Sequence, residues 1–399
     1  MNELEMHFNE LKAKNLHLDM TRGKPCKEQL DLSLGMMDVL SSKVSFLDEN
    51  SFDVRNYGEL DGIPEAKKLM ADILGLKLEN VIVYGNSSLN IMYDQISRSY
   101  SHGVLGSTPW CKLPKIKWIC LVPGYDRHFA ICERFGIEMI SVDLKDDGPD
   151  MDKVEELVKD EFVKGIWCVP KYSNPTGITY SNEVIKRLAN LKPAAKDFRI
   201  YYDNAYALHN IDDKDDQLLN IFDEAKKANN EDIVYLFTST SKISFPGSGI
   251  SALGASKANL EEIKKQLSYQ IISFDKVNQL RHVRFFKDKN GIIAHMKKHQ
   301  QILKPKFEIV TSYLEKISDI ISFNKPRGGY FVTIKVTRNA DRVIKRCASC
   351  GVKLTEAGAT HPYHKDPTNS YIRLAPTYLN EEELKQAMDV IITSIKLES

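Results

Sequence analysis

The chain has 399 residues, of which 42% are hydrophobic and 27% charged, which is usual for a globular protein of two or three domains. Fifty-five basic residues against 54 acidic ones give a net charge of +1, so charge offers no argument for nucleic acid or an anionic membrane as a partner. No apolar run approaches the roughly 18 residues that span a bilayer, the acidic start has no signal core, and the seven cysteines are irregularly spaced, which together predict a cytoplasmic protein without a disulfide framework.

Short apolar runs rich in β-branched and aromatic residues predict strands along the first two thirds of the chain. They cover 81–84, 118–122, 138–142, 165–169, 198–202, 233–237 and 251–254. Segments with helical periodicity separate most of them, at about 64–74, 89–96, 152–162, 182–191 and 259–267. Strands that alternate with helices predict an α/β domain with a mainly parallel, mixed sheet of seven strands.

The last part of the chain changes character. A long helical stretch at about 291–317 precedes strand-like segments at 328–334 and 371–374, which predict a smaller α+β domain. We therefore assign residues 48–290 to a large domain, and residues 1–47 together with 291–399 to a small one. No internal repeat or low-complexity segment interrupts the chain.

Polar residues follow several predicted strands, where ligands gather in such sheets. Lys242 ends a run of hydroxyl residues after one strand, Asn174 opens Asn174-Pro175-Thr176-Gly177 after another, and Asp203 follows a third. Each alone has a simpler explanation, as a solvated lysine, a tight turn or a loop-capping aspartate. Together and in this order they describe a socket for pyridoxal 5′-phosphate (PLP), with Lys242 as the Schiff-base amine.

Each part of this cofactor requires a different group. The Asp203 carboxylate could keep the pyridine nitrogen protonated, and Asn174 and Tyr206 could hydrogen-bond the phenolic oxygen. Tyr125 follows another strand and could stack on the ring. His128 could support Asp203, although an isolated histidine is more often structural.

The phosphate and the substrate carboxylate also have candidate partners. Asn86, Ser87 and Ser88 follow the 81–84 strand and open a predicted helix, whose amides suit a phosphate, although an ordinary serine N-cap explains them equally. Ser239 could add a hydroxyl. Arg373 lies in a strand-like apolar segment, where its planar guanidinium could bind the α-carboxylate of an amino acid.

The order of Asn174, Asp203, Tyr206, Lys242 and Arg373, with the spacings Asp203-x-x-Tyr206 and Ser239-x-x-Lys242, resembles that of the class I/II aminotransferases of fold type I. The likeness covers nearly the entire chain. It implies the PLP-dependent transferase fold (type I), PLP as the cofactor, and amino acids and 2-oxo acids as substrates, with Lys242 moving the Cα proton.

The segment Arg55-Asn56-Tyr57-Gly58 is similar to one whose tyrosine, in this family, reaches the phosphate of the neighbouring subunit. The resemblance implies that Tyr57 does so in a homodimer with shared active sites, although a packed loop aromatic explains it equally. Thr21-Arg22-Gly23-Lys24-Pro25 and the segment 275–284 resemble a bacterial subgroup of aspartate aminotransferases. That likeness implies ping-pong transfer of the amino group from L-aspartate to 2-oxoglutarate.

One position departs from the family pattern. Most members carry a phosphate-binding arginine eight residues after the lysine, where this chain has Ile250. The phosphate would then depend on hydroxyls and amides, Ser248 among them.

A dicarboxylic substrate also needs a second cation. Arg22, next to Gly23 in an arm that could cover the site, is favoured over Arg281 and Arg284, and a plain surface arginine remains an equal alternative for each.

Other functions remain open on the sequence alone. An aminotransferase for aromatic amino acids or alanine, a β-lyase or a decarboxylase would share Asp203, Lys242 and Arg373. The segment 247–252 imitates a weak dinucleotide-binding G-x-G-x-x-A fingerprint, but it precedes a strand rather than a helix. A DNA-binding regulator on the same fold would need a module ahead of the arm at Thr21, for which we expect no room.

Two further motifs suggest metals but favour simpler readings, and we predict no metal site. Cys347 and Cys350 form a single CxxC without a second pair, which favours packed thiols. His295 and His299 are spaced like zinc ligands but lie among lysines, which favours a solvated helix face.

Overall fold

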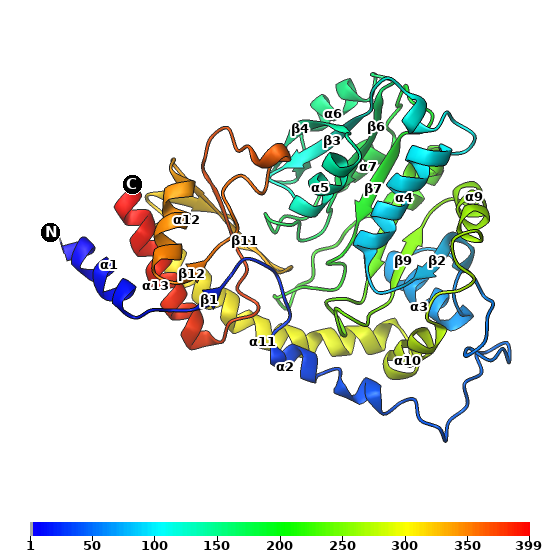
Figure 1. The fold of residues 1–399 in the computed structure, drawn as a ribbon, viewed down its shortest axis with the longest axis horizontal. Helices are drawn as coiled ribbons and strands as arrows, with labels where there is room; N and C mark the ends of the chain where they lie inside the picture. Colours follow the sequence, from blue (N-terminus) through cyan, green and yellow to red (C-terminus); the bar gives the residue numbers. More distant parts are fainter. Residues whose placement is uncertain (1–2) are drawn as a thin grey trace.

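A mixed sheet of eight strands forms the centre of the larger part of the computed structural model, which describes residues 3–399 (Figure 1). The strand order is β2-β9-β8-β7-β6-β3-β4-β5. The strands are β2 (Val81–Tyr84), β3 (Lys117–Val122), β4 (Glu138–Lys145), β5 (Gly148–Pro149), β6 (Val163–Cys168), β7 (Arg199–Asp203), β8 (Val234–Ser239) and β9 (Ser251–Gly254). The five strands from β8 to β4 pair in parallel, and β9 is antiparallel to both β8 and β2.

The predicted α/β class and all seven predicted strands are confirmed. The eighth strand, β5, has two residues paired antiparallel to β4, which is too short to leave a periodic signal in the sequence. Asp203 is the last residue of β7 rather than the first residue after it.

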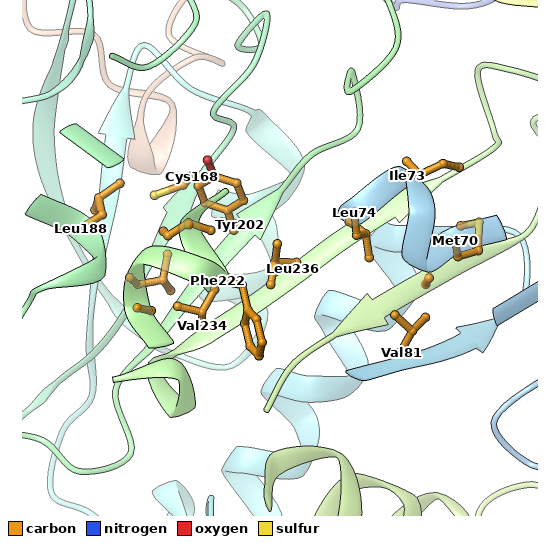
Figure 2. Close-up of a cluster of buried hydrophobic side chains, with 14 of the residues drawn as sticks. Met70, Ile73, Leu74, Val81, Cys168, Leu188, Tyr202, Phe222, Val234 and Leu236 are labelled. Atoms are coloured by element: carbon orange, nitrogen blue, oxygen red, sulfur yellow. The ribbon is translucent and has the colours of Figure 1, made fainter. Parts of the chain in front are cut away.

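Helices cover both faces of this sheet (Figure 1). They are α3 (Pro64–Leu74), α4 (Ser88–His102), α5 (Asp126–Arg134), α6 (Met151–Leu157), α7 (Asn182–Ala189), α8 (Ile221–Lys227), α9 (Lys257–Leu267) and α10 (Lys276–Phe286). Successive residues of a strand point to opposite faces, so Tyr201 and Tyr202 of β7 pack into different hydrophobic clusters. Figure 2 shows the cluster of Tyr202, with Leu236 and Leu74. Burial on both faces explains why the strands read as continuous apolar runs.

The smaller part contains a three-stranded antiparallel sheet in the order β10-β11-β13. Its elements are α1 (Glu3–Ala13), β1 (Leu18–Asp19), α2 (Lys27–Asp31), α11 (Lys289–Glu315), β10 (Ile321–Phe323), β11 (Val332–Val336), α12 (Ala340–Ser349), β12 (Val352–Lys353), β13 (Tyr371–Leu374) and α13 (Glu381–Glu398). Strand β1 pairs in parallel with β12, and α1 packs against α13, so the two ends of the chain lie together (Figure 1).

The long helix α11 contributes to both parts. Ile292 and Met296 belong to a cluster of the large sheet, whereas Leu303 and Leu314 belong to that of the small one. The division into 48–290 and 1–47 with 291–399 stays a proposal, since the first turns of α11 pack with the large sheet. None of the helices within residues 3–399 has both the length and the apolar character needed to cross a membrane.

One sequence interpretation is wrong. His295 and His299 do not form a solvated face, since their side chains are only 6% and 1% exposed. The lysines at 297 and 298 face solvent instead, because they lie on the other side of α11. Cys347 and Cys350 are both buried free thiols.

Candidate active site

A pocket of about 350 Å³ lies where β6, β7 and β8 end, between the two parts of the chain. The predicted site residues that line it are Arg22, Gly23, Ser87, Ser88, Tyr125, Asn174, Asp203, Tyr206, Ser239, Lys242 and Arg373. The residues that the sequence did not single out include Lys24, Asp126, Arg127, Ser241 and Phe331. Residues more than 350 positions apart in the chain therefore meet around one cavity.

Lys242 lies in the loop that follows β8, with Nζ 5.1 Å from the ring centroid of Tyr206. Burial lowers the pKa of its amine, and the nearby Asp203 carboxylate acts in the opposite direction. A lowered pKa increases the fraction of neutral amine, which is the form that attacks a carbonyl carbon. The position and the environment of Lys242 thus suit a nucleophile.

Asp203 is buried beside His128, whose Nε2 lies 3.2 Å from Asp203 Oδ2. The His128 ring stacks on Trp167 at 4.5 Å, and the Tyr125 ring meets it edge-on at 4.9 Å. The other carboxylate oxygen, Oδ1, is buried without a hydrogen-bond partner among residues 3–399. An unpaired buried carboxylate oxygen is costly, so this atom suits a ligand that donates a hydrogen bond to it.

Ser87, Ser88, Ser239 and Ser241 all line the pocket, and the Ser241 hydroxyl donates to the Asn86 carbonyl at 2.6 Å. Ser87 is the N-cap residue of α4, but its side chain makes no capping hydrogen bond. A helix N-terminus with hydroxyls around it suits a phosphate group. The sequence missed Ser241, although it lies next to Lys242.

Three predicted cofactor-binding residues do not line this pocket. Asn86 turns away and donates from Nδ2 to the Pro246 carbonyl at 3.2 Å. Ser248 is hydrogen-bonded by the guanidinium of Arg281. Tyr57 is 75% exposed, so in a single chain it contributes nothing to the pocket.

Ile250, at the position of the usual arginine, is buried in the hydrophobic cluster of the large sheet. Its side chain therefore makes no polar contribution to the phosphate end.

Arg373 on β13 is buried and faces the pocket beside the Phe331 ring. Its Nη1 donates to Asp126 Oδ1 at 2.9 Å, and its Nη2 donates to Thr355 Oγ1 at 3.1 Å and to the Thr21 carbonyl at 3.3 Å. The Nε atom is buried without a partner among the described residues. Asp126 was not predicted, because nothing in the sequence relates it to a residue nearly 250 positions away.

Arg22 and Arg127 line the pocket and are exposed, and their side chains have no hydrogen-bond or ion-pair partner among residues 3–399. The other two arginines considered for a distal carboxylate bind elsewhere, Arg281 to Ser248 and Arg284 to the carbonyl of Ser45. The sequence missed Arg127, although its place two residues after Tyr125 at the start of α5 could have indicated it.

The comparisons with known proteins agree with this geometry. The family described as "Aspartate amino-transferase" matches residues 1–399. The chain is 46% identical over 401 residues to the aspartate aminotransferase of Corynebacterium glutamicum, which covers 99% of this chain and 92% of that protein. A solved aspartate transaminase structure from the same organism has a TM-score of 0.96 at 45% identity, covering 99% of this chain and 94% of that one.

More distant solved structures show the same fold. A kynurenine aminotransferase from Pyrococcus horikoshii, solved in complex with PMP, has a TM-score of 0.79 at 18% identity, covering 100% of this chain and 95% of that one. The architecture is therefore that of the type I aminotransferases, as the sequence predicts. Since both the full-length sequence match and the fold agree, the chain belongs to the aspartate aminotransferase family.

Proposed function

We propose that this aminotransferase binds PLP through Lys242 and transfers the amino group of L-aspartate to 2-oxoglutarate in a ping-pong cycle. The family acts on amino acids and 2-oxo acids. The observation that carries the proposal is the meeting of Lys242 with Asp203, whose buried Oδ1 lacks a partner within residues 3–399. A protonated pyridine nitrogen would satisfy that oxygen, so the residues present fit the cofactor.

The remaining residues would hold the other parts of PLP. Ser87, Ser88, Ser239 and Ser241 line the pocket and would bind the phosphate. Tyr125 and the pair Asn174 and Tyr206 would face the ring and its phenolic oxygen. A related fold with bound PMP, that of the Pyrococcus kynurenine aminotransferase, supports this choice of cofactor.

When bound, PLP supplies the electron sink that makes loss of the Cα proton possible. Arg373 would bind the α-carboxylate, in competition with Asp126 for Nη1. Lys242 Nζ would then take the proton from Cα, as an amine of lowered pKa can. Asp203, supported by His128, would hold the proton on the ring nitrogen.

The cations at the pocket support a dicarboxylic substrate. Arg22 and Arg127 line the pocket without partners of their own in the described chain, so either can meet a distal carboxylate. The name of the Corynebacterium relative, aspartate aminotransferase, agrees with this preference. The alternative is another amino donor, aromatic or alanine, or a PLP-dependent lyase on the same fold.

We also propose a homodimer with shared sites. Large apolar side chains are exposed along the N-terminal segment and the loop before α10, as shown by Tyr57 at 75%, Tyr269 at 86%, Met37 at 60% and Ile272 at 59%. Figure 1 shows the blue segment between α2 and α3 running along the edge of the molecule past α10. An apolar surface of this kind suits burial against a second copy.

A donor–acceptor screen tests the proposed reaction. Purified protein with PLP is incubated with 2-oxoglutarate and single amino acids, and glutamate and each new oxo acid are measured. We expect aspartate to be the best donor, with its product oxaloacetate formed in equal amount to glutamate. A preference for aromatic donors or alanine, or pyruvate release without glutamate, would reject the assignment. A cytoplasmic location stays a prediction from the sequence.

A further inference from the structure

A buried polar network lies beneath Lys242, and the proposed reaction makes no use of it. It consists of Gln29, Ser33, His295, His299 and Tyr330, which we call the lysine-support network. All five side chains are buried. They come from α2, the turn after it, α11 and the segment before β11, so the network joins the N-terminal arm to both parts of the chain.

The network ends on two backbone carbonyls of the loop that carries the lysine. Tyr330 Oη donates to the Lys242 carbonyl at 3.3 Å. His295 Nε2 lies 3.0 Å from the Ile243 carbonyl, and Ser33 Oγ lies 3.5 Å from the same oxygen. Side chains from distant segments therefore hold the backbone at the site of the amine.

One amide sets the direction of these hydrogen bonds. The Cys26 backbone N–H donates to Gln29 Oε1 at 3.1 Å, which turns Gln29 Nε2 toward both Tyr330 Oη and His299 Nδ1, each at 2.9 Å. Because Tyr330 accepts from Gln29, its own hydroxyl hydrogen is free for the Lys242 carbonyl.

The side-chain amide of Gln29 also determines which nitrogen of His299 carries the proton. Since His299 Nδ1 accepts, the neutral ring carries its proton on Nε2, which faces His295 Nε2 at 3.1 Å. Burial lowers the pKa of both rings, that of His299 to about 3, and neither ring pairs with a carboxylate anywhere in residues 3–399. Both imidazoles are therefore neutral. His295 accepts at Nε2 from His299 and so has no proton there for the Ile243 carbonyl, which leaves Tyr330 and Ser33 as the donors to the loop backbone.

We propose that the lysine-support network positions the catalytic amine, because Gln29 and Tyr330 together fix the Lys242 backbone relative to Asp203. The inference rests on the proposed role of Lys242. The five residues of the lysine-support network are positioning residues, since none of them lines the pocket. The N-terminal arm would then contribute to the geometry of the amine as well as to the pocket wall through Arg22.

A double-mutant cycle tests this coupling. Tyr330→Phe removes the hydroxyl alone, and Gln29→Leu removes the amide at similar size. The free energy of one hydrogen bond of ordinary strength corresponds to roughly a fivefold change in rate. We therefore expect each variant to lower kcat by about fivefold, with KM little changed. The double variant should be no worse than either single variant, since both act through the same chain.

A second measurement needs no loaded enzyme. The pH dependence of Lys242 labelling by a small amine reagent, followed on the cofactor-free protein by peptide mass spectrometry, reports the environment of the amine. We expect both variants to shift this profile. Tyr202→Phe is the matched control, because its buried hydroxyl has no partner among the described residues, and it should leave the profile and kcat unchanged.

Additive losses in kcat, or an unchanged labelling profile with only a lower melting temperature, would overturn the positioning role. Failure of the proposed function looks different, since wild-type protein would then form no borohydride-stable adduct with PLP at Lys242. If the wild-type protein is trapped normally and the variants behave like Tyr202→Phe, the positioning role of the network is rejected and the proposed role of Lys242 stands.

Discussion

Arg22 and Arg127 differ from the other arginines near the active site because their side chains make no hydrogen bond or ion pair within the described residues. Arg373 is committed to Asp126 and Thr355, and Arg281 to Ser248. A guanidinium without a protein partner at a pocket is available to a ligand carboxylate. We therefore expect the substrate preference to depend on these two side chains.

The first prediction concerns this preference. Loss of one charge-assisted hydrogen bond weakens binding by a factor of roughly 10 to 100. Arg22→Met or Arg127→Met should therefore lower kcat/KM for aspartate by that factor. Alanine has no distal carboxylate, and its kcat/KM should change little. Arg284→Met is the control, because this guanidinium binds the Ser45 carbonyl away from the pocket. Equal losses of kcat/KM for aspartate and alanine in both variants would show that neither arginine binds the distal carboxylate.

The second prediction concerns acid stability. Burial lowers the pKa of His282 from 6.5 to about 4. The unfolded chain therefore binds a proton that the folded chain does not, and the free energy of unfolding should decrease as pH falls from about 6.5 to about 4. His282→Gln should make this decrease shallower, as measured by urea unfolding at several pH values. The exposed His17→Gln should leave the slope unchanged, and an identical slope in all three proteins would contradict the assignment.

At the level of elements, helix α13 shows how local sequence and packing combine. Asn380 Oδ1 accepts from the Glu383 N–H at 2.9 Å, and Glu383 Oε2 accepts from the Asn380 N–H at 2.9 Å, which is a capping box. The helix packs on α11, α12 and α1, so its start fixes one side of the small part of the chain.

The third prediction follows from this cap. Asn380→Ala should lower the free energy of unfolding by about 1 kcal/mol, because the Glu383 N–H at the start of α13 loses its acceptor. Glu382→Ala, in the same turn but outside the cap, should stay within about 0.5 kcal/mol of wild type. Chemical denaturation measures both changes. kcat should be unaffected in each, and a loss of kcat without a loss of stability would place α13 in the catalytic machinery instead.

The sequence predicts elements best where their signal is local. Continuous apolar runs predicted the seven main strands, because strands buried on both faces have that pattern. The pairing of Leu18 with Val352 joins segments far apart in the chain, and no periodicity reveals it. The interpretation of His295 and His299 failed for the same reason, since their partners Gln29 and Ser33 lie more than 250 residues away.

The residues of the candidate site also differ in how far the sequence predicts them. Lys242, Asp203, Asn174, Tyr206 and Arg373 could be singled out, because their spacing resembles that of a known family. Asp126 could not, since it meets Arg373 only in the folded chain. Arg127 and Ser241 were missed although they lie close to Tyr125 and Lys242 in the sequence. The side chains of Asn86 and Ser248 bind the Pro246 carbonyl and Arg281 of α10 instead, and these contacts depend on packing rather than on local sequence.

At the level of the whole molecule, a single chain leaves Tyr57 exposed and several large apolar side chains uncovered. A pocket whose phosphate end lacks the usual arginine would gain a hydroxyl from a second subunit if Tyr57 reaches across. The dimer is then part of the active site rather than a separate property of the chain.

The fourth prediction tests that sharing by mixing subunits. Tyr57→Ala should weaken PLP binding by roughly tenfold, the value of one hydrogen bond to a charged group. Lys242→Ala should have no turnover. If Tyr57 serves the partner's site, a mixed dimer of the two variants contains one intact site, so mixing after partial unfolding should restore tight PLP binding and turnover. No restoration, with mixed dimers verified by mass, would place Tyr57 in its own subunit or outside the site.

The central claim is that Lys242 is the residue that carries the cofactor, and covalent trapping tests it most directly. The protein is incubated with PLP, reduced with borohydride, digested and mapped by mass spectrometry. We predict a phosphopyridoxyl group on Lys242 in the wild-type chain and none in the corresponding peptide of Lys242→Ala. Trapping at another lysine, or no adduct in the wild-type protein, would contradict the assignment of this pocket.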